Sequence, residues 1–171
     1  MARYQVIVVG AGPAGALTAR HAAAGARVLL LDRRAEIGEP IRCGGLIRTA
    51  SLSQFAPVKG PWVVTTFDRY RLVSPGGVSV CCEQPREGTL IDRRIFDAEL
   101  VRTAEAAGAR VMTQANAEGV IRDGERIVGV EVSIAGERRQ LFCDLVVAAD
   151  GVASRIARSA GLDTKLTITT L

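Results

Sequence analysis

The first 32 residues follow the pattern of one complete strand–helix–strand unit. A strand-like apolar run over residues 4–9 leads directly into Gly10-Ala11-Gly12-Pro13-Ala14-Gly15, and the helical stretch that follows ends near Gly25. A second apolar run, over residues 27–31, ends at Asp32, where such units place the acid that accepts hydrogen bonds from a ribose. The whole unit, rather than the glycine motif alone, predicts that the chain binds a dinucleotide.

Three glycines of this motif have separate physical tasks. Gly10 permits the tight turn after the strand, Gly12 lets the backbone approach a pyrophosphate closely, and Gly15 lets the helix pack against the sheet. Pro13 suits the first helical turn because it has no N–H to satisfy, and the unpaired N–H groups of that turn face the phosphates. The alternative is an ordinary strand–helix–strand crossover with a glycine turn and no ligand.

Composition narrows the class of protein further. With 171 residues, 48% of them hydrophobic, the chain can bury one substantial core, which predicts one domain and a piece of another. The 22 basic and 18 acidic residues are spread along the chain and only 4% of residues are aromatic, so we expect no nucleic-acid partner. No apolar stretch is long enough to span a bilayer, whereas peripheral membrane contact stays open.

The cysteine and histidine content predicts a reduced, cytoplasmic chain without a metal site. The four cysteines show neither CxxC spacing nor the density of a secreted disulfide scaffold. A single histidine, His21, makes a His-rich metal site impossible. The cysteines are Cys43, Cys81, Cys82 and Cys143.

The middle of the chain is predicted to be an irregular segment followed by antiparallel strands. Residues 33–61 contain many glycines and prolines, and loops of this length tend to be functional. Residues 62–67, 69–74 and 78–83 are typical of short strands, the last two joined by the turn Pro75-Gly76-Gly77. These strands predict an antiparallel insertion.

The α/β pattern then returns. Asp92 is a candidate N-cap for a helix with apolar residues at helical spacing, which is predicted to end at Gly108. Three extended runs between residues 117 and 143 are separated by turn dipeptides, which predicts a β-meander across one face of the sheet. Residues 144–149 are expected to form another parallel strand, followed by Asp150-Gly151 and a short helix.

Four motifs in this order make the chain similar to a known group of flavoproteins, the FAD-dependent geranylgeranyl reductase-like branch that is related to the aromatic-ring hydroxylases. They are the strand–helix–strand unit, AEIGEPIRCGGL (35–46), LIDRRIFDAEL (90–100) and VVAADGVASRIAR (146–158). The resemblance covers essentially all 171 residues and implies FAD rather than NAD. It implies an α/β fold: a Rossmann-like FAD/NAD(P)-binding domain with a parallel sheet, a β-meander crossover and a small antiparallel insertion from a truncated substrate domain.

The resemblance also implies how the chain divides. Residues 1–61 and 86–161 are assigned to the FAD-binding domain, and residues 62–85 and 162–171 to parts of a substrate domain. Because the family continues for roughly twice as much sequence, the chain is expected to be an N-terminal fragment that binds FAD weakly and turns over no substrate alone. Oligomeric state is not predicted.

Residues that match the family's motifs form the implied cofactor-binding set. They are Gly10, Gly12, Pro13, Ala14, Gly15, Asp32, Arg33, Arg42, Cys43, Gly44, Arg93, Ala117, Asp150 and Gly151. The glycine turn would face the pyrophosphate, Asp32 the adenosine ribose, Arg33 the adenine side, and Ala117 the adenine through backbone atoms. Asp150 and Gly151 would contact the diphosphate and ribose region, although Asp150 is also a candidate helix cap.

The flavin end of the cofactor is assigned to the loop Arg42-Cys43-Gly44, with Arg93 reaching the cofactor from the start of its helix. The resemblance makes Cys43 the candidate catalytic residue, because the family's reductases place a cysteine in this loop beside flavin and substrate, where a partly exposed thiol is able to contact the reacting alkene or donate a proton. The alternatives are inert packing for Cys43 and a solvated surface charge for Arg33 or Arg42.

The resemblance implies a flavoprotein oxidoreductase. Reduced flavin would transfer hydride to an unsaturated, apolar, prenyl-type small molecule, with NAD(P)H as the candidate electron donor, and the flavin would supply the chemistry. One departure concerns the substrate: prenyl reductases commonly have an acidic residue after the Cys-Gly pair, where this chain has Gly45 and Leu46. The alternatives are an FAD-dependent monooxygenase and a cofactor-binding module without turnover.

Overall fold

The computed structural model describes residues 3–41 and 43–162, with the backbone alone for residues 84–87. The predictions for Arg42 and for residues 163–171 lie outside the described residues. Within them, the chain forms two compact units, one from residues up to 39 together with those from 97 onward, and one from residues 40–96. Each unit is described by itself.

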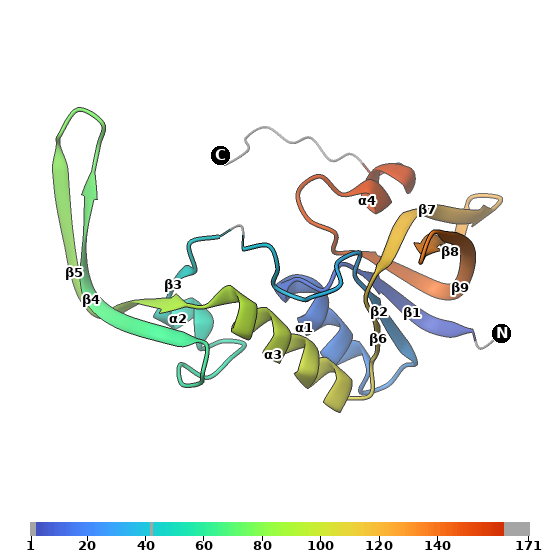
Figure 1. The fold of residues 1–171 in the computed structure, drawn as a ribbon, viewed down its shortest axis with the longest axis horizontal. Helices are drawn as coiled ribbons and strands as arrows, with labels where there is room; N and C mark the ends of the chain where they lie inside the picture. Colours follow the sequence, from blue (N-terminus) through green and yellow to red (C-terminus); the bar gives the residue numbers. More distant parts are fainter. Residues whose placement is uncertain (1–2, 42, 163–171) are drawn as a thin grey trace. The chain divides into compact units, whose positions relative to one another are not determined.

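The first unit is built on a six-stranded mixed sheet in the order β6-β2-β1-β9-β8-β7 (Figure 1). Its elements are β1 (Tyr4–Val9), α1 (Pro13–Ala22), β2 (Val28–Leu31), β6 (Arg110–Met112), β7 (Ala115–Asp123), β8 (Arg126–Ile134), β9 (Glu137–Ala148) and α4 (Arg155–Ser159). Helix α3 (Arg93–Ala106) begins in the second unit and continues in the first. The predicted α/β fold class, with a parallel sheet, a meander and a separate antiparallel sheet, is confirmed.

The parallel half of the sheet places the predicted dinucleotide unit at its centre. Strand β1 pairs in parallel with β2 on one side, through Val6 and Val28, and with β9 on the other, through Val6 and Leu145. Strand β2 is apolar throughout, as expected for a strand that is buried on both faces of a parallel sheet, whereas most residues of β9 are exposed or half-buried. All four residues of β2 are buried.

One hydrophobic cluster ties the parallel strands to the meander. Ile7 of β1 and Leu29 of β2 pack in the same cluster as Val130 and Val132 of β8 and Ile156 of α4. All five side chains are buried. The meander therefore covers one face of the parallel strands, as the sequence predicted, and the cluster fixes α4 against the sheet.

The end of the meander differs from the prediction. The runs expected as a last meander strand and a separate parallel strand over residues 144–149 form the single strand β9. Its first part pairs antiparallel with β8 and its second part pairs in parallel with β1, beginning at Cys143. No turn residue separates the two runs, so one strand serves both pairings and the expected break is wrong.

The second unit holds a three-stranded antiparallel sheet in the order β3-β5-β4. Its elements are β3 (Leu46–Arg48), α2 (Thr49–Leu52), β4 (Val63–Val73) and β5 (Ser79–Ile91). The two strands expected at residues 62–67 and 69–74 form the one strand β4, with a register shift against β5 between Phe67 and Arg69. The prediction of two strands is wrong because a bulge bends a strand without ending it.

The second unit also contains more regular structure than the sequence predicted. Part of the segment expected to be irregular, residues 33–61, forms β3 and the single turn of α2. Trp62 is buried and its ring lies 6.0 Å from that of Phe96. Residues 40–61 and 86–96 cluster with the antiparallel strands, whereas the predicted assignment of these segments to an FAD-binding domain stays a prediction.

Within the described part of the chain, no helix has both the length and the apolar character that crossing a membrane requires. No group of three or more His, Cys, Asp or Glu side chains among the same residues is placed to hold a metal ion.

Candidate dinucleotide-binding site

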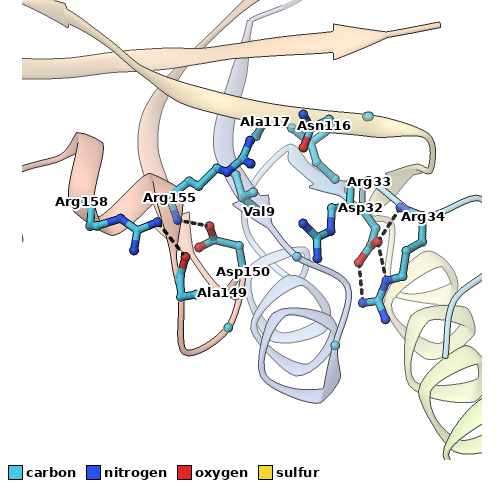
Figure 2. A pocket seen from close by; sticks show the side chains of 16 residues that line it. Val9, Asp32, Arg33, Arg34, Asn116, Ala117, Ala149, Asp150, Arg155 and Arg158 are labelled. Carbon is cyan, nitrogen blue, oxygen red and sulfur yellow. Dashed lines mark hydrogen bonds and ion pairs between the residues drawn. The ribbon is translucent and has the colours of Figure 1, made fainter. Parts of the chain in front are cut away.

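A pocket of about 460 Å³ opens in the first unit, where the parallel strands end (Figure 2). Its wall contains the last residues of β1 and β2, the residues that follow β9, and the first residues of β7. In open α/β sheets, ligands bind beyond the carboxyl ends of the strands. Seven of the predicted site residues line this pocket: Gly10, Gly12, Asp32, Arg33, Ala117, Asp150 and Gly151.

At two positions of the glycine turn, the surrounding backbone leaves no room for a side chain. Gly10 has φ +101°, and a Cβ added there would overlap the carbonyl oxygen of Ala149. A Cβ on Gly15 would overlap the carbonyl oxygen of Gly10. Both positions therefore require glycine for the turn itself and for its packing, whether or not a ligand is bound.

Gly12 is different because no described residue lies where its side chain would be. It is the N-cap of α1, with φ −71° and ψ 179°, and an added Cβ would find no atom within 4 Å. Gly12 is also one of the residues that line the pocket. The position leaves room for a group from outside the chain to approach the backbone closely, which is the fit that a pyrophosphate needs.

Helix α1 begins beside this space. Pro13 occupies its first turn, and no side chain caps its N-terminus in the described residues. The helix has ten residues, so its dipole and its first N–H groups are available to an anion at the end that follows Gly12. Ala14 belongs to the same turn, and its role at the phosphates stays a prediction.

Asp32 is the most constrained polar residue of the pocket. Its side chain is 3% exposed, and Ala11 of the glycine turn donates its backbone N–H to Oδ2 at 2.8 Å. Arg34 donates three further hydrogen bonds, from its backbone N and Nε to Oδ1 and from Nη2 to Oδ2 (Figure 2). The carboxylate therefore ties the glycine turn to the end of β2.

These hydrogen bonds also determine the charge of Asp32. Burial on its own would raise the pKa of the carboxyl, but the hydrogen bonds from the Arg34 side chain and backbone and from the Ala11 N–H outweigh it. The net result is a pKa of Asp32 below its ordinary value. The pocket thus presents a carboxylate that stays ionised at neutral pH, as an acceptor for hydroxyl donors must be.

Asp150 caps helix α4. Its Oδ2 accepts hydrogen bonds from the backbone N–H groups of Arg155, at 2.8 Å, and Ile156, at 3.3 Å, and its Oδ1 accepts one from the Ser154 hydroxyl. The helix begins at Arg155, whereas the sequence predicted that it begins directly after Gly151, at Val152. Asp150 therefore stabilises the start of α4, although the N-cap residue itself is Ser154, whose hydroxyl accepts the Ala157 N–H. Asp150 also lines the pocket together with Gly151, and its contact with the cofactor stays a prediction.

Three other predicted residues lie in the second compact unit. Cys43 and Gly44 are exposed and precede β3, and Arg93 is the half-buried first residue of α3. Arg42 lies outside the described residues. Their contact with a cofactor, and the catalytic role of Cys43, stay predictions.

Sequence reasoning missed four polar residues that line the pocket. They are Arg34, Asn116, Arg155 and Arg158. A sequence signal existed for Arg34. An Asp side chain often accepts the backbone N–H of the residue two positions later, and Arg34 stands two positions after Asp32. The two arginines of α4 lacked a signal, because only the tertiary position of a short helix brings them to the pocket.

The fold and pocket together define a Rossmann-type dinucleotide-binding protein. Residues 5–91 match the model of a family described as FAD dependent oxidoreductase, and residues 76–170 match one described as FAD binding domain. The chain belongs to the FAD-dependent oxidoreductases. The predicted cofactor, FAD rather than NAD, is confirmed.

The relatives also confirm the resemblance to geranylgeranyl reductases. The chain is 39% identical to a digeranylgeranylglycerophospholipid reductase of Methanoculleus marisnigri over 94% of this chain and 42% of the relative. It is 30% identical to a geranylgeranyl bacteriochlorophyll reductase-like protein from Thermoplasma acidophilum, with a TM-score of 0.89 over 96% of this chain and 44% of that one. The chain therefore spans less than half the length of these relatives.

A hydroxylase has the same fold. CabE, an aromatic hydroxylase from angucycline biosynthesis, is 25% identical, with a TM-score of 0.67 over 95% of this chain and 34% of that one.

Proposed function

We propose that the pocket of the first unit binds the adenosine diphosphate half of FAD. Asp32 accepts hydrogen bonds from the ribose, the diphosphate lies at the Gly12 backbone and the α1 N-terminus, and the adenine lies between Arg33 and the β7 backbone at Ala117. The observation that carries the proposal is the open space at Gly12, because the other two motif glycines are explained by the fold alone. A pocket of 460 Å³ falls within the usual range for small-molecule and cofactor sites.

The reaction proposed for the full-length protein is reduction of an unsaturated, prenyl-type lipid. FAD supplies the hydride when it is reduced, and this chain's residues bind and orient the cofactor. Support for the substrate class comes from the relative named for a digeranylgeranylglycerophospholipid. NAD(P)H as electron donor, cytoplasmic location and peripheral membrane contact belong to the same proposal.

The second unit supports an apolar substrate. A groove in this unit is lined by Leu46, Ile47 and Arg48 of β3 and by Phe67, Tyr70 and Leu72 of β4. Leu46 is 64% exposed and Leu72 is 59% exposed, so the groove presents hydrocarbon beside one arginine. An apolar surface of this kind lowers its free energy by contacting hydrocarbon rather than water.

Monooxygenation is the second candidate function, favoured by the shared fold of the aromatic hydroxylase. The two reactions differ in what reoxidises the reduced flavin. A prenyl reductase gives its electrons to the alkene, whereas a monooxygenase gives them to O₂.

The deciding experiment follows flavin absorbance in the FAD-loaded full-length protein after anaerobic chemical reduction. Addition of a geranylgeranyl lipid is expected to reoxidise the flavin and yield the saturated lipid, detected by mass spectrometry. Oxygen uptake stimulated by an aromatic substrate would instead favour the monooxygenase. FAD binding without either reaction would favour a cofactor-binding module, and the Gly12→Val chain serves as the control without bound FAD.

A further inference from the structure

Arg155 is an arginine of the pocket wall to which neither the family motifs nor the comparisons give a role. Its backbone N–H donates to Asp150 Oδ2 at 2.8 Å, which anchors the start of α4 beside the pocket. Its side chain is exposed and lines the pocket, and Figure 2 shows it running from α4 toward Ala117 of β7. The backbone is thus fixed by the cap while the guanidinium is directed at the cavity.

The four arginines of the pocket divide into two engaged and two available side chains. Arg34 is bound to Asp32, and Arg158 donates from Nη2 to the carbonyl oxygen of Ala153 at 3.2 Å. Within the described residues, the side chains of Arg33 and Arg155 form no hydrogen bond or ion pair. The two available guanidinium groups are therefore the ones that a ligand is able to recruit.

The acids of the pocket do not compete for these groups. Among the described residues, Asp32 accepts hydrogen bonds from Ala11 and Arg34, and Asp150 accepts them from the α4 N–H groups and Ser154, so neither acid is paired with the guanidinium group of Arg33 or Arg155. Arg33 follows Asp32 at the end of β2, and Arg155 lines the same pocket from α4 (Figure 2). The lining of the pocket therefore offers two planar cations to an aromatic ring.

We infer that Arg155 contacts the adenine ring of the bound cofactor from the α4 side. The inference rests on the proposed function, since Asp32 at the ribose and Ala117 at the base are what place adenine there. A guanidinium stacks well on a purine because both are planar and the cation is attracted to the π face. Arg155 is thereby a binding residue for the adenosine half of FAD, with no part in hydride transfer.

The test is calorimetric titration of the 171-residue chain with FAD and with ADP. Arg155→Ala is expected to weaken the binding of both ligands by about tenfold, the size of a partly desolvated cation–π contact. Arg155→Lys is expected to recover only part of this loss, because an ammonium group is not planar. The loss is expected to persist between about 50 mM and about 300 mM salt, since stacking is screened less than an exposed ion pair with phosphate.

Arg126→Ala is the matched control, because Arg126 is exposed at the start of β8 and does not line the pocket. It is expected to bind both ligands as the parent chain does, and circular dichroism of all three variants checks the fold. Unchanged affinity of Arg155→Ala would make Arg155 a solvated surface residue and overturn the inference. A loss that Lys restores fully and that high salt abolishes would place Arg155 at the phosphates and also overturn it. If the parent chain binds neither ligand, the proposed function fails and the inference fails with it.

Discussion

A substitution at Gly12 is expected to weaken cofactor binding while leaving the fold nearly as stable. The φ of −71° and ψ of 179° at this position are accessible to any L-residue, and a side chain there would extend into open space. Gly12→Val therefore changes the free energy of unfolding by only ~1 kcal/mol, mainly because Val is a poor N-cap. The same side chain fills the volume that we assign to the diphosphate.

The expected loss of cofactor follows from that overlap. Forcing extra methyl groups into a close contact costs ~1–3 kcal/mol even where the surroundings adapt, so FAD should bind at least about tenfold more weakly. Flavin fluorescence measures the affinity, and urea denaturation measures the stability.

Gly10→Ala is the contrasting variant. It introduces a Cβ at φ +101° and against the Ala149 carbonyl, so we expect a loss of stability of ~2–5 kcal/mol. A Gly12→Val chain that keeps its yellow colour through purification would refute the assignment of the diphosphate to this space. A Gly12→Val chain as unstable as Gly10→Ala would refute the geometry on which the argument rests.

Three further predictions concern acids and the exposed thiol. Asp32→Ala should weaken FAD binding by about 1–3 kcal/mol, the scale of a lost hydrogen bond to a charged group, and unchanged affinity in a fluorescence titration would contradict the ribose assignment. Hydrogen bonds from Arg94 lower the pKa of Asp92 to about 2, below its value of 3.8 in an unfolded chain. The Asp92 carboxylate therefore stabilises the fold above pH 3.8, and this stabilisation should be lost as pH falls toward about 2. An Asp92→Asn chain with the same acid denaturation curve as the parent chain would contradict this role of Asp92. Cys43, exposed before β3, should react with a thiol reagent more slowly when FAD is present, and equal rates would place it away from the cofactor.

Local sequence signals predicted the centre of the fold because they act over short distances. The apolar strand, the glycine turn and the helix start at Pro13 are encoded within ten residues of each other, and α1 forms where the pattern placed it. The N-cap role of Asp92 and the helix end before Gly108, which has φ +103°, follow from the same kind of local chemistry.

Features that depend on tertiary pairing were not predictable. Strand β9 is continuous because its first part pairs with β8 and its second part with β1. The residues of β9 alone do not predict these two pairings. The carboxylate of Asp32 was predicted to meet a ribose, but its bonds to Ala11 and Arg34 depend on how the turn folds back on β2. Arg155 reaches the pocket only because α4 packs against the sheet through Ile156.

Competition between ligands tests the central claim most directly, because ADP and FMN each carry one part of FAD. We predict that FAD binds the 171-residue chain, that ADP displaces it, and that FMN does not, since the pocket of the first unit is assigned to the adenosine diphosphate half. Displacement by FMN and not by ADP, or no binding of FAD at all, would contradict the account.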